Sequence, residues 1–472
     1  MRQKRDFTEG SILKALLSLS IPIIFANFLQ TAYNLTDTFW VGRLGTSAVA
    51  AVSVSFPIIF LVISLGAGMA MAGAILVAQY KGRKSQEAID HIAAQTLLVT
   101  GGMALVLSAL GYFIAPSLLR LMKVAPAVFS QAVSYMRISF LGVVFMFLYA
   151  AFQSLMRGVS NVKIPVFIIL GTVLLNLVLD PFFVFGFGFL PAMGVGGAAL
   201  ASLVTEFLSA LIAIIILFRG KEGIQINLTQ FKPDFPLIKK MFLLGWPSSL
   251  EQSTRSLGLT VVTFLVTGFG TLALASYGIG VRILSFILIP AMGLSMATST
   301  LVGQNIGAGK IKRAERTIRL SLLIGFWGLT AAGILLFVFA QPVVSLFIPG
   351  EKATIQVASN FLRIMALSFG FLGVQQIIKG VFRGAGDTLT AMGLSLLFLW
   401  GLRLPLVYCL SRCTSLGLTG IWWAFPLSNI LAAMVAMFSF SLGRWKKKRL
   451  TEEVQLEDAL AEEAEVIGKI ND

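Results

Sequence analysis

Apolar residues gather in twelve long runs, which are separated by short polar segments. Each run has roughly the 20 residues that a helix needs to cross the hydrocarbon core of a bilayer, or more. The runs lie near residues 13–41, 47–79, 92–115, 131–156, 164–187, 193–218, 240–266, 271–303, 317–340, 357–382, 388–410 and 416–442. This pattern predicts an all-α integral membrane protein with twelve transmembrane helices.

The second half of the chain repeats the first half in register. Val77–Ala78–Gln79 aligns with Val302–Gly303–Gln304 at an offset of 225 residues, and Arg157–Gly158 aligns with Arg383–Gly384 at an offset of 226. Because six spans separate equivalent positions, both halves have the same orientation and the repeat is parallel. The expected fold is therefore two parallel-repeat six-helix bundles around a central cavity.

The repeat also sets the expected domain boundaries. We predict an N-lobe with spans 1–6, a cytoplasmic linker, a C-lobe with spans 7–12, and a cytoplasmic tail that is first basic and then acidic. These parts are residues 1–220, 221–239, 240–443 and 444–472.

Composition and charge agree with a membrane protein and give its orientation. Only 12% of the residues are charged, against about one quarter in soluble domains. The chain has 37 Lys and Arg against 21 Asp and Glu; of the basic residues in the connecting segments and tail, 25 fall on the side of the N-terminus and 5 on the other. The positive-inside rule then places both termini in the cytoplasm, and we expect a multi-pass protein in the cytoplasmic membrane of a prokaryote. Basic residues spread over short loops do not indicate nucleic-acid binding.

Several kinds of chemistry are excluded by what the chain lacks. His91 is the only histidine, and Cys409 and Cys413 are the only cysteines. These residues provide neither a metal-ligand set nor a nucleophile–histidine pair. No glycine-rich segment has the spacing and strand context of a phosphate loop. We therefore expect no enzyme and no cofactor.

Four carboxylates fall inside the predicted spans: Asp37, Asp180, Glu206 and Glu251. A carboxylate at the bilayer midplane costs at least about 2.5 kcal/mol, so such residues mark functional sites by default. The first three align with neutral residues in the second half of the chain. Because a need of the scaffold alone would be expected in both halves, this asymmetry favours a function for the N-lobe.

Polar residues recur every three or four positions around these acids, which places them on shared helix faces. Clustered carboxylates can carry a proton, and carboxylate, amide and hydroxyl oxygens are also ligands for sodium. Hydrogen bonding between helices is the alternative for the neutral members. The predicted cation-coupling residues are Asn34, Asp37, Asn176, Asp180, Thr205 and Glu206.

Glu251 has two interpretations. Arg255 lies four residues later on the same helix face, so the two can form an ion pair; if Arg255 points elsewhere, Glu251 becomes a cation site that faces the cavity. The residues predicted to line a substrate cavity are Gln30, Gln153, Glu251 and Gln252.

The sequence resembles the multidrug and toxic compound extrusion family, the MATE transporters, and in particular their DinF-type branch. The resemblance extends to about residue 443. The residues that carry it are Glu9–Gly10–Ser11–Ile12, Pro22, Thr36–Asp37, Trp40–Val41–Gly42, Gln79 with Gly82, Gln304 with Gly307, Asn176, Asp180–Pro181, Gly196–Gly197–Ala198–Ala199 and both Arg–Gly pairs.

This resemblance implies a monomeric exporter that exchanges cationic amphiphilic compounds for protons or sodium ions and confers antibiotic resistance. Asp37 would be the coupling residue, and Asn176 and Asp180 would complete a site for a proton or sodium. A lipid-linked oligosaccharide flippase of the same superfamily is the alternative. It is expected to show two extra spans or a cationic cavity, and neither is evident in the sequence.

Overall fold

The computed structural model describes residues 7–188, 191–446, 448, 450 and 451. Its regular elements are helices, joined for the most part by short turns. The acidic end of the predicted tail, residues 452–472, lies outside the described residues.

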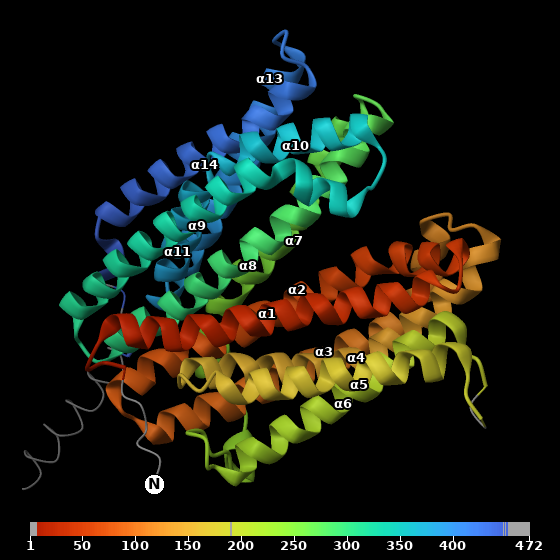
Figure 1. The fold of residues 1–472 in the computed structure, drawn as a ribbon. Helices are drawn as coiled ribbons and strands as arrows, with labels where there is room; N and C mark the ends of the chain where they lie inside the picture. Colours follow the sequence, from red (N-terminus) through yellow and green to blue (C-terminus); the bar gives the residue numbers. More distant parts are fainter. Residues whose placement is uncertain (1–6, 189–190, 447, 449, 452–472) are drawn as a thin grey trace, which may run out of the picture.

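The first six helices correspond to the first six apolar runs, each within several residues of its expected bounds. They pack into one bundle, in which α4 contacts α2, α3 and α6, and α5 contacts α1 and α6 (Figure 1). The helices are α1 Ile12–Gly42, α2 Thr46–Arg83, α3 Gln86–Leu121, α4 Pro126–Gly158, α5 Lys163–Phe185 and α6 Gly194–Arg219.

The second half forms another bundle, but two of its predicted spans are interrupted. One span is a pair of helices bent by 56°, and another contains a π-helical segment, a feature frequently found at functional sites. The elements are η1 Leu228–Phe231, α7 Phe235–Thr267, α8 Thr271–Gly307, α9 Ile311–Phe347, the bent pair α10 Lys352–Ala366 and α11 Phe369–Gly384, α12 Thr388–Leu396, the π-helical η2 Leu397–Arg403, α13 Leu404–Arg412, α14 Leu418–Ser441 and η3 Arg444–Lys446.

Ten helices of the described chain are long and apolar enough to cross a membrane, and the bent pair makes eleven. The remaining span of the twelve is α7, whose charged and polar residues, including Glu251 and Arg255, lower its hydropathy. The twelve transmembrane helices in two repeats thus agree with the structure. The low hydropathy of α7 indicates a polar site in the second bundle.

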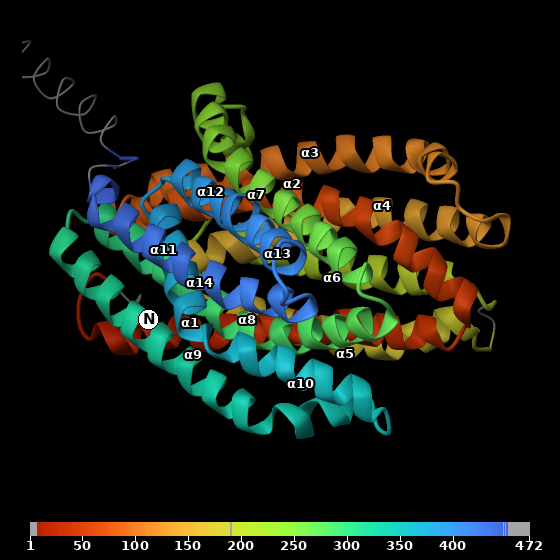
Figure 2. The same cartoon turned by 90° about the horizontal axis from the view of Figure 1, so that it is seen from above.

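The two bundles lie together at one end and diverge toward the other (Figure 1). We call the first the closed end; it carries the first turn of α1 and the last turns of α2 and α8. Helices α1 and α2 of the first bundle pack against α7 and α8 of the second, and the view from above shows α1 beside α8 (Figure 2).

Aligned residues of the repeat exchange equivalent contacts at the closed end. The side-chain amide of Gln79 donates to the carbonyl of Gly384 at 3.1 Å, and that of Gln304 donates to the carbonyl of Gly158 at 2.8 Å. The helices approach so closely that a Cβ on Gly307 would lie 1.8 Å from the carbonyl oxygen of Gln79. Only glycine fits at this position without separating the bundles.

The segment after α14 packs onto the closed end. Trp445 is fully buried. Lys446 pairs with Glu315 at 2.5 Å, and Lys448 pairs with Asp387 at 2.7 Å. The backbone N–H of Leu450 donates to the side chain of Gln79 at 3.0 Å. The C-terminal segment therefore contacts both bundles.

Candidate functional site

The polar pair on α5 is buried as the sequence predicts. Asn176 and Asp180 are one helical turn apart, so they lie on one face, and both are completely inaccessible to solvent. The amide nitrogen of Asn176 donates to Asp180 Oδ1 at 3.0 Å. This bond fixes the orientation of both side chains.

Three oxygens at this site are buried without a hydrogen-bond donor among the described residues: Asp37 Oδ1, Asn176 Oδ1 and Asp180 Oδ2. Buried polar atoms in proteins are nearly always paired, so this set calls for a ligand that supplies positive charge. Asp37 also interacts electrostatically with both Asp180 and Glu206. The arrangement suits a proton or a small hard cation.

Sodium would need neutral ligands as well at this site. Within the described part of the chain, no three His, Cys, Asp or Glu side chains are close enough together to hold a metal ion. Asn176 therefore supplies an oxygen that two carboxylates alone would not, and the residues present fit sodium, which binds carboxylate and amide oxygens alike.

Two tyrosines belong to this site and were not predicted. The hydroxyl of Tyr33 hydrogen-bonds with that of Thr205 at 3.2 Å, which links α1 to α6. Tyr135 on α4 interacts electrostatically with all three acids of the N-lobe. Tyr33 lies four residues before Asp37, a spacing that signals a shared helix face. Tyr135 has no such local signal, because its neighbours come from other helices.

The other predicted site residues differ in their burial and do not all lie at one site. Glu206 packs against α4, where its carboxylate lies 2.9 Å from the position that a Cβ on Gly142 would take. Asn34 and Gln30 are exposed on α1, while Gln153 and Gln252 are half-buried. Of the four residues predicted to line a substrate cavity, Glu251 lines the cavity of the C-lobe described next, whereas the other three do not.

Glu251 makes its direct ion pairs with residues of α11 and not with Arg255. Its carboxylate accepts hydrogen bonds from Arg383 at 2.6 Å and from the hydroxyl of Ser395 at 2.6 Å, and Lys379 lies 3.6 Å away. Lys379 and Arg383 are one turn apart on α11, so both side chains reach the same carboxylate on α7. The direct ion pair with Arg255 is therefore not formed, and the carboxylate that lines the cavity is compensated by Lys379 and Arg383 instead.

A cavity of about 160 Å³ lies beside Glu251 in the C-lobe, and we call it the basic cavity. Its walls are largely apolar. The charged side chains that line it are Glu251, Arg255, Lys379 and Arg403. A cationic cavity is thus present. Its basic residues come from three separate helical segments, so the sequence alone does not show that they meet.

Arg403 lies in the π-helical η2 and is almost fully buried. It donates to the hydroxyl of Ser428 at 3.1 Å and to the side-chain oxygen of Asn429 at 2.8 Å. Asn429 is the residue that aligns with Glu206 in the repeat. The C-lobe therefore has an arginine with neutral partners in the region where the N-lobe has a carboxylate.

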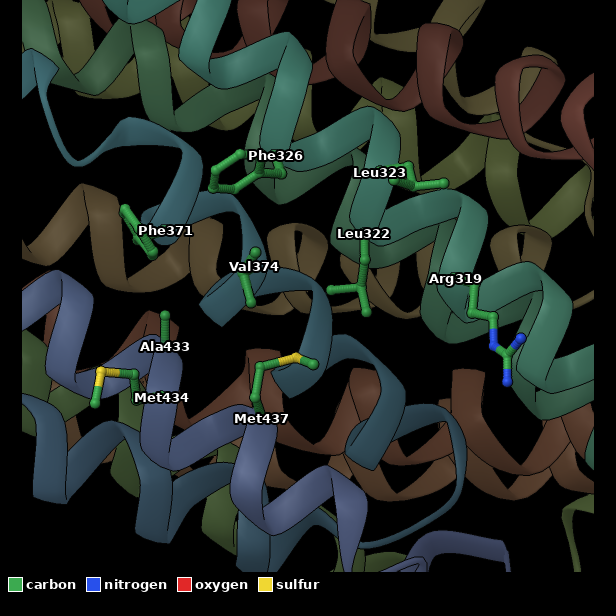
Figure 3. Close-up of a pocket in the computed structure, with 9 residues that line it drawn as sticks. All are labelled: Arg319, Leu322, Leu323, Phe326, Phe371, Val374, Ala433, Met434 and Met437. Carbon is green, nitrogen blue, oxygen red and sulfur yellow. The ribbon is translucent and has the colours of Figure 1, made fainter.

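A larger cavity of about 560 Å³ lies on the outer side of the C-lobe, between α9, α11 and α14 (Figure 3). Of the nine residues that line it, Arg319 alone is charged, and the others are apolar. A surface of this kind fits against lipid acyl chains. It lacks the convergent polar groups that orient a ligand, so the acidic and basic sites remain the candidates.

The MatE family model matches residues 22–182 and 247–409, one segment in each half of the repeat. The probable multidrug resistance protein YoeA of Bacillus subtilis is 31% identical over 453 residues, which cover 95% of this chain and 97% of that protein. The FAD transporter of Shewanella oneidensis is 25% identical over 441 residues, which cover 93% of this chain and 96% of that protein.

Solved structures agree with these relatives. A MOP superfamily transporter from Pyrococcus furiosus Vc1, described as having a binding pocket of reverse polarity that suggests a different function, superposes with a TM-score of 0.86. It is 26% identical, and the match covers 94% of this chain and 98% of that chain. Since the family model matches more than half of the sequence, this chain belongs to the MATE family of multidrug efflux transporters, which are membrane transporters and not enzymes.

Proposed function

We propose that this transporter is a secondary active antiporter that exports cationic amphiphilic compounds in exchange for protons or sodium ions. The observation that carries the proposal is the set of buried, unpaired oxygens of Asp37, Asn176 and Asp180. Carboxylates held together away from water favour a bound proton or cation over two uncompensated negative charges. No such acidic set lines the basic cavity of the C-lobe.

The exchange follows from competition between two positively charged ligands. With Asp37 and Asp180 charged, the N-lobe takes up a cation from outside; its binding neutralises the pocket, bends α1 near Pro22 and displaces the substrate. The return state takes up substrate from the cytoplasm. Antiport requires only that the cation and the substrate favour different conformations. In this proposal the closed end faces the cytoplasm, where the positive-inside rule places both termini.

Reconstitution of the purified protein in proteoliposomes tests the proposal. Ethidium transport would be measured under an imposed proton gradient and, separately, under an imposed sodium gradient, which identifies the coupling ion. Asp37→Asn should abolish gradient-driven transport. Glu87→Gln, the matched change at an exposed position on α3, should leave it intact. Full gradient-driven transport by Asp37→Asn would show that the coupling site is wrong.

One observation favours a second candidate, the lipid-linked oligosaccharide flippase. The basic cavity provides the cationic surroundings that a lipid-linked pyrophosphate needs. Twelve helices, without the two extra spans expected of such a flippase, favour the exporter. Translocation of a fluorescent prenyl-pyrophosphate lipid in the same proteoliposomes, with no ethidium transport, would reverse this choice.

A further inference from the structure

We propose that the basic cavity of the C-lobe binds an anionic amphiphile, a molecule with a carboxylate or phosphate group on an apolar body. This site goes beyond the proposed antiport, which concerns positively charged ligands and the acidic site of the N-lobe, and it does not require the flippase activity of the second candidate. The two lobes then offer ligand sites of opposite polarity within one repeated scaffold.

Positive charge exceeds negative charge in and around the cavity. Arg255, Lys379 and Arg403 line it, with Arg383 directly behind, and Glu251 is the one acid in its lining. Both oxygens of Glu251 are already engaged, one by Arg383 and the other by Ser395 and Lys379. Glu251 therefore offsets the charges on α11, and no hydrogen bond joins it to either of the two remaining arginines among the described residues.

Neither of the two remaining arginines forms a direct ion pair with a carboxylate among the described residues, and Arg255 interacts with Glu251 only through longer-range electrostatics. Arg255 is half-buried, and the described structure assigns it neither a hydrogen bond nor an ion pair. Arg403 is 8% exposed, and its partners are neutral: Ser428, Asn429 and the rings of Phe398 and Phe425, whose centroids lie 4.2 and 4.6 Å from its guanidinium carbon. An uncompensated buried charge is costly, and an oxyanion in the cavity would offset that cost.

The rest of the lining determines what the anion is attached to. Apolar side chains from several helices complete the walls, among them Leu284, Ile287, Phe369 and Trp400. A free inorganic anion would leave these walls without contacts. A ligand that joins an oxyanion to a ring or an alkyl chain satisfies both parts of the cavity.

Equilibrium binding to the full-length protein in phosphatidylcholine nanodiscs tests the site. The probe is 1-naphthyl phosphate, with inorganic phosphate and the cation 1-naphthylmethylammonium as comparisons. Naphthyl phosphate should bind saturably and more tightly than either comparison. No saturable binding of naphthyl phosphate, or tighter binding of the cation, would overturn the proposal.

Variants locate the binding. Arg255→Gln should weaken binding of naphthyl phosphate by at least about tenfold, because it removes a charged donor. Arg282→Gln makes the same change at an exposed position on α8 that does not line the cavity, so the affinity should be unchanged. Equal affinities of the wild-type protein and Arg255→Gln would refute the site.

A variant with the opposite expected sign separates binding from misfolding. Glu251→Gln removes the carboxylate that competes for the cations of the cavity, so binding of naphthyl phosphate should become several-fold tighter. A misfolded variant would bind more weakly, and weaker binding by a correctly folded Glu251→Gln would contradict the proposal.

The source of the anion is distinguished by adding phosphatidic acid to the nanodiscs. Competition with naphthyl phosphate would support a lipid headgroup as the natural ligand, and undiminished binding would support a soluble anion. None of these measurements needs an ion gradient. Loss of anion binding would therefore leave the antiport proposal intact, and full transport by Asp37→Asn would leave the anion site intact.

Discussion

Replacing Gly307 by alanine should open the closed end. Gly307 on α8 faces the backbone of α2, and an added Cβ would lie 1.8 Å from the carbonyl oxygen of Gln79 and 2.6 Å from its carbonyl carbon. Both atoms belong to the backbone, so no side-chain rotation relieves the contact. The two bundles have to separate.

The size of the effect follows from these distances. Ordinary contact begins near 3.4 Å, so the Cβ and the carbonyl must move apart by about 1.6 Å. The bond from Gln304 to Gly158, 2.8 Å long, tolerates less than half of that movement before it is lost. Overpacking costs about 1–3 kcal/mol and a lost hydrogen bond about 1 kcal/mol. A total of at least about 2 kcal/mol changes the ratio of conformers about thirtyfold.

Distances between two spin labels, measured by double electron–electron resonance, would detect the opening. Labels at Glu87→Cys and Arg316→Cys report on the closed end of each bundle, after the exposed Cys409 and Cys413 are replaced by serine. Gly307→Ala should increase the population of longer distances.

The control is Gly278→Ala, the same change on the same helix. A Cβ on Gly278 has no neighbour within 4 Å, so the distance distribution should match that of the wild-type protein. Equal distributions for both variants would refute the claim that contact between backbones holds the closed end together.

Two further predictions concern stability, measured by thermal unfolding of the purified protein. Asp234 hydrogen-bonds with His91 at 3.0 Å and caps α7, and these bonds hold the pKa of Asp234 below its usual range. A carboxylate whose pKa is depressed in the folded state stabilises the fold at pH values above its unfolded-state pKa. Asp234→Ala should therefore lower the melting temperature at pH 7, and the difference should shrink as the pH falls below about 3.9, the unfolded-state pKa of Asp. A difference that stays constant with pH would contradict this. Phe361→Ala removes a fully buried aromatic side chain of the C-lobe and should lower the free energy of unfolding by about 3–5 kcal/mol. Phe113→Ala, on the exposed face of α3, should change stability little. Equal losses of stability in the two variants would argue against the described core.

Most of the fold was predictable from the sequence because each transmembrane helix corresponds to a continuous apolar run. Apolar runs predicted the twelve spans, and only their interruptions were missed. The bend between α10 and α11 falls at Leu367–Ser368, with no proline nearby to mark it. The packing of neighbouring helices, rather than the local sequence, has to account for this break.

The difference between local sequence and packing between helices also explains which parts of the candidate sites were predicted. The bond from Asn176 to Asp180 joins residues four apart on one helix, so their spacing predicts the pairing. Glu251 and Arg383 are 132 positions apart, and nothing in one sequence shows that a side chain on α11 reaches a carboxylate on α7. For this reason the partners of Glu251, and with them the basic cavity, emerged only from the structure.

The reciprocal contacts at the closed end have a consequence for how the chain is assembled. Gln79 binds the backbone of the second half as Gln304 binds that of the first, which is the self-complementary arrangement of a two-fold symmetric dimer. A six-helix protein with one such glutamine would close on a second copy of itself. Tandem fusion of two copies preserves that interface and frees each half to change its interior independently, so one half can keep carboxylates while the other acquires arginines.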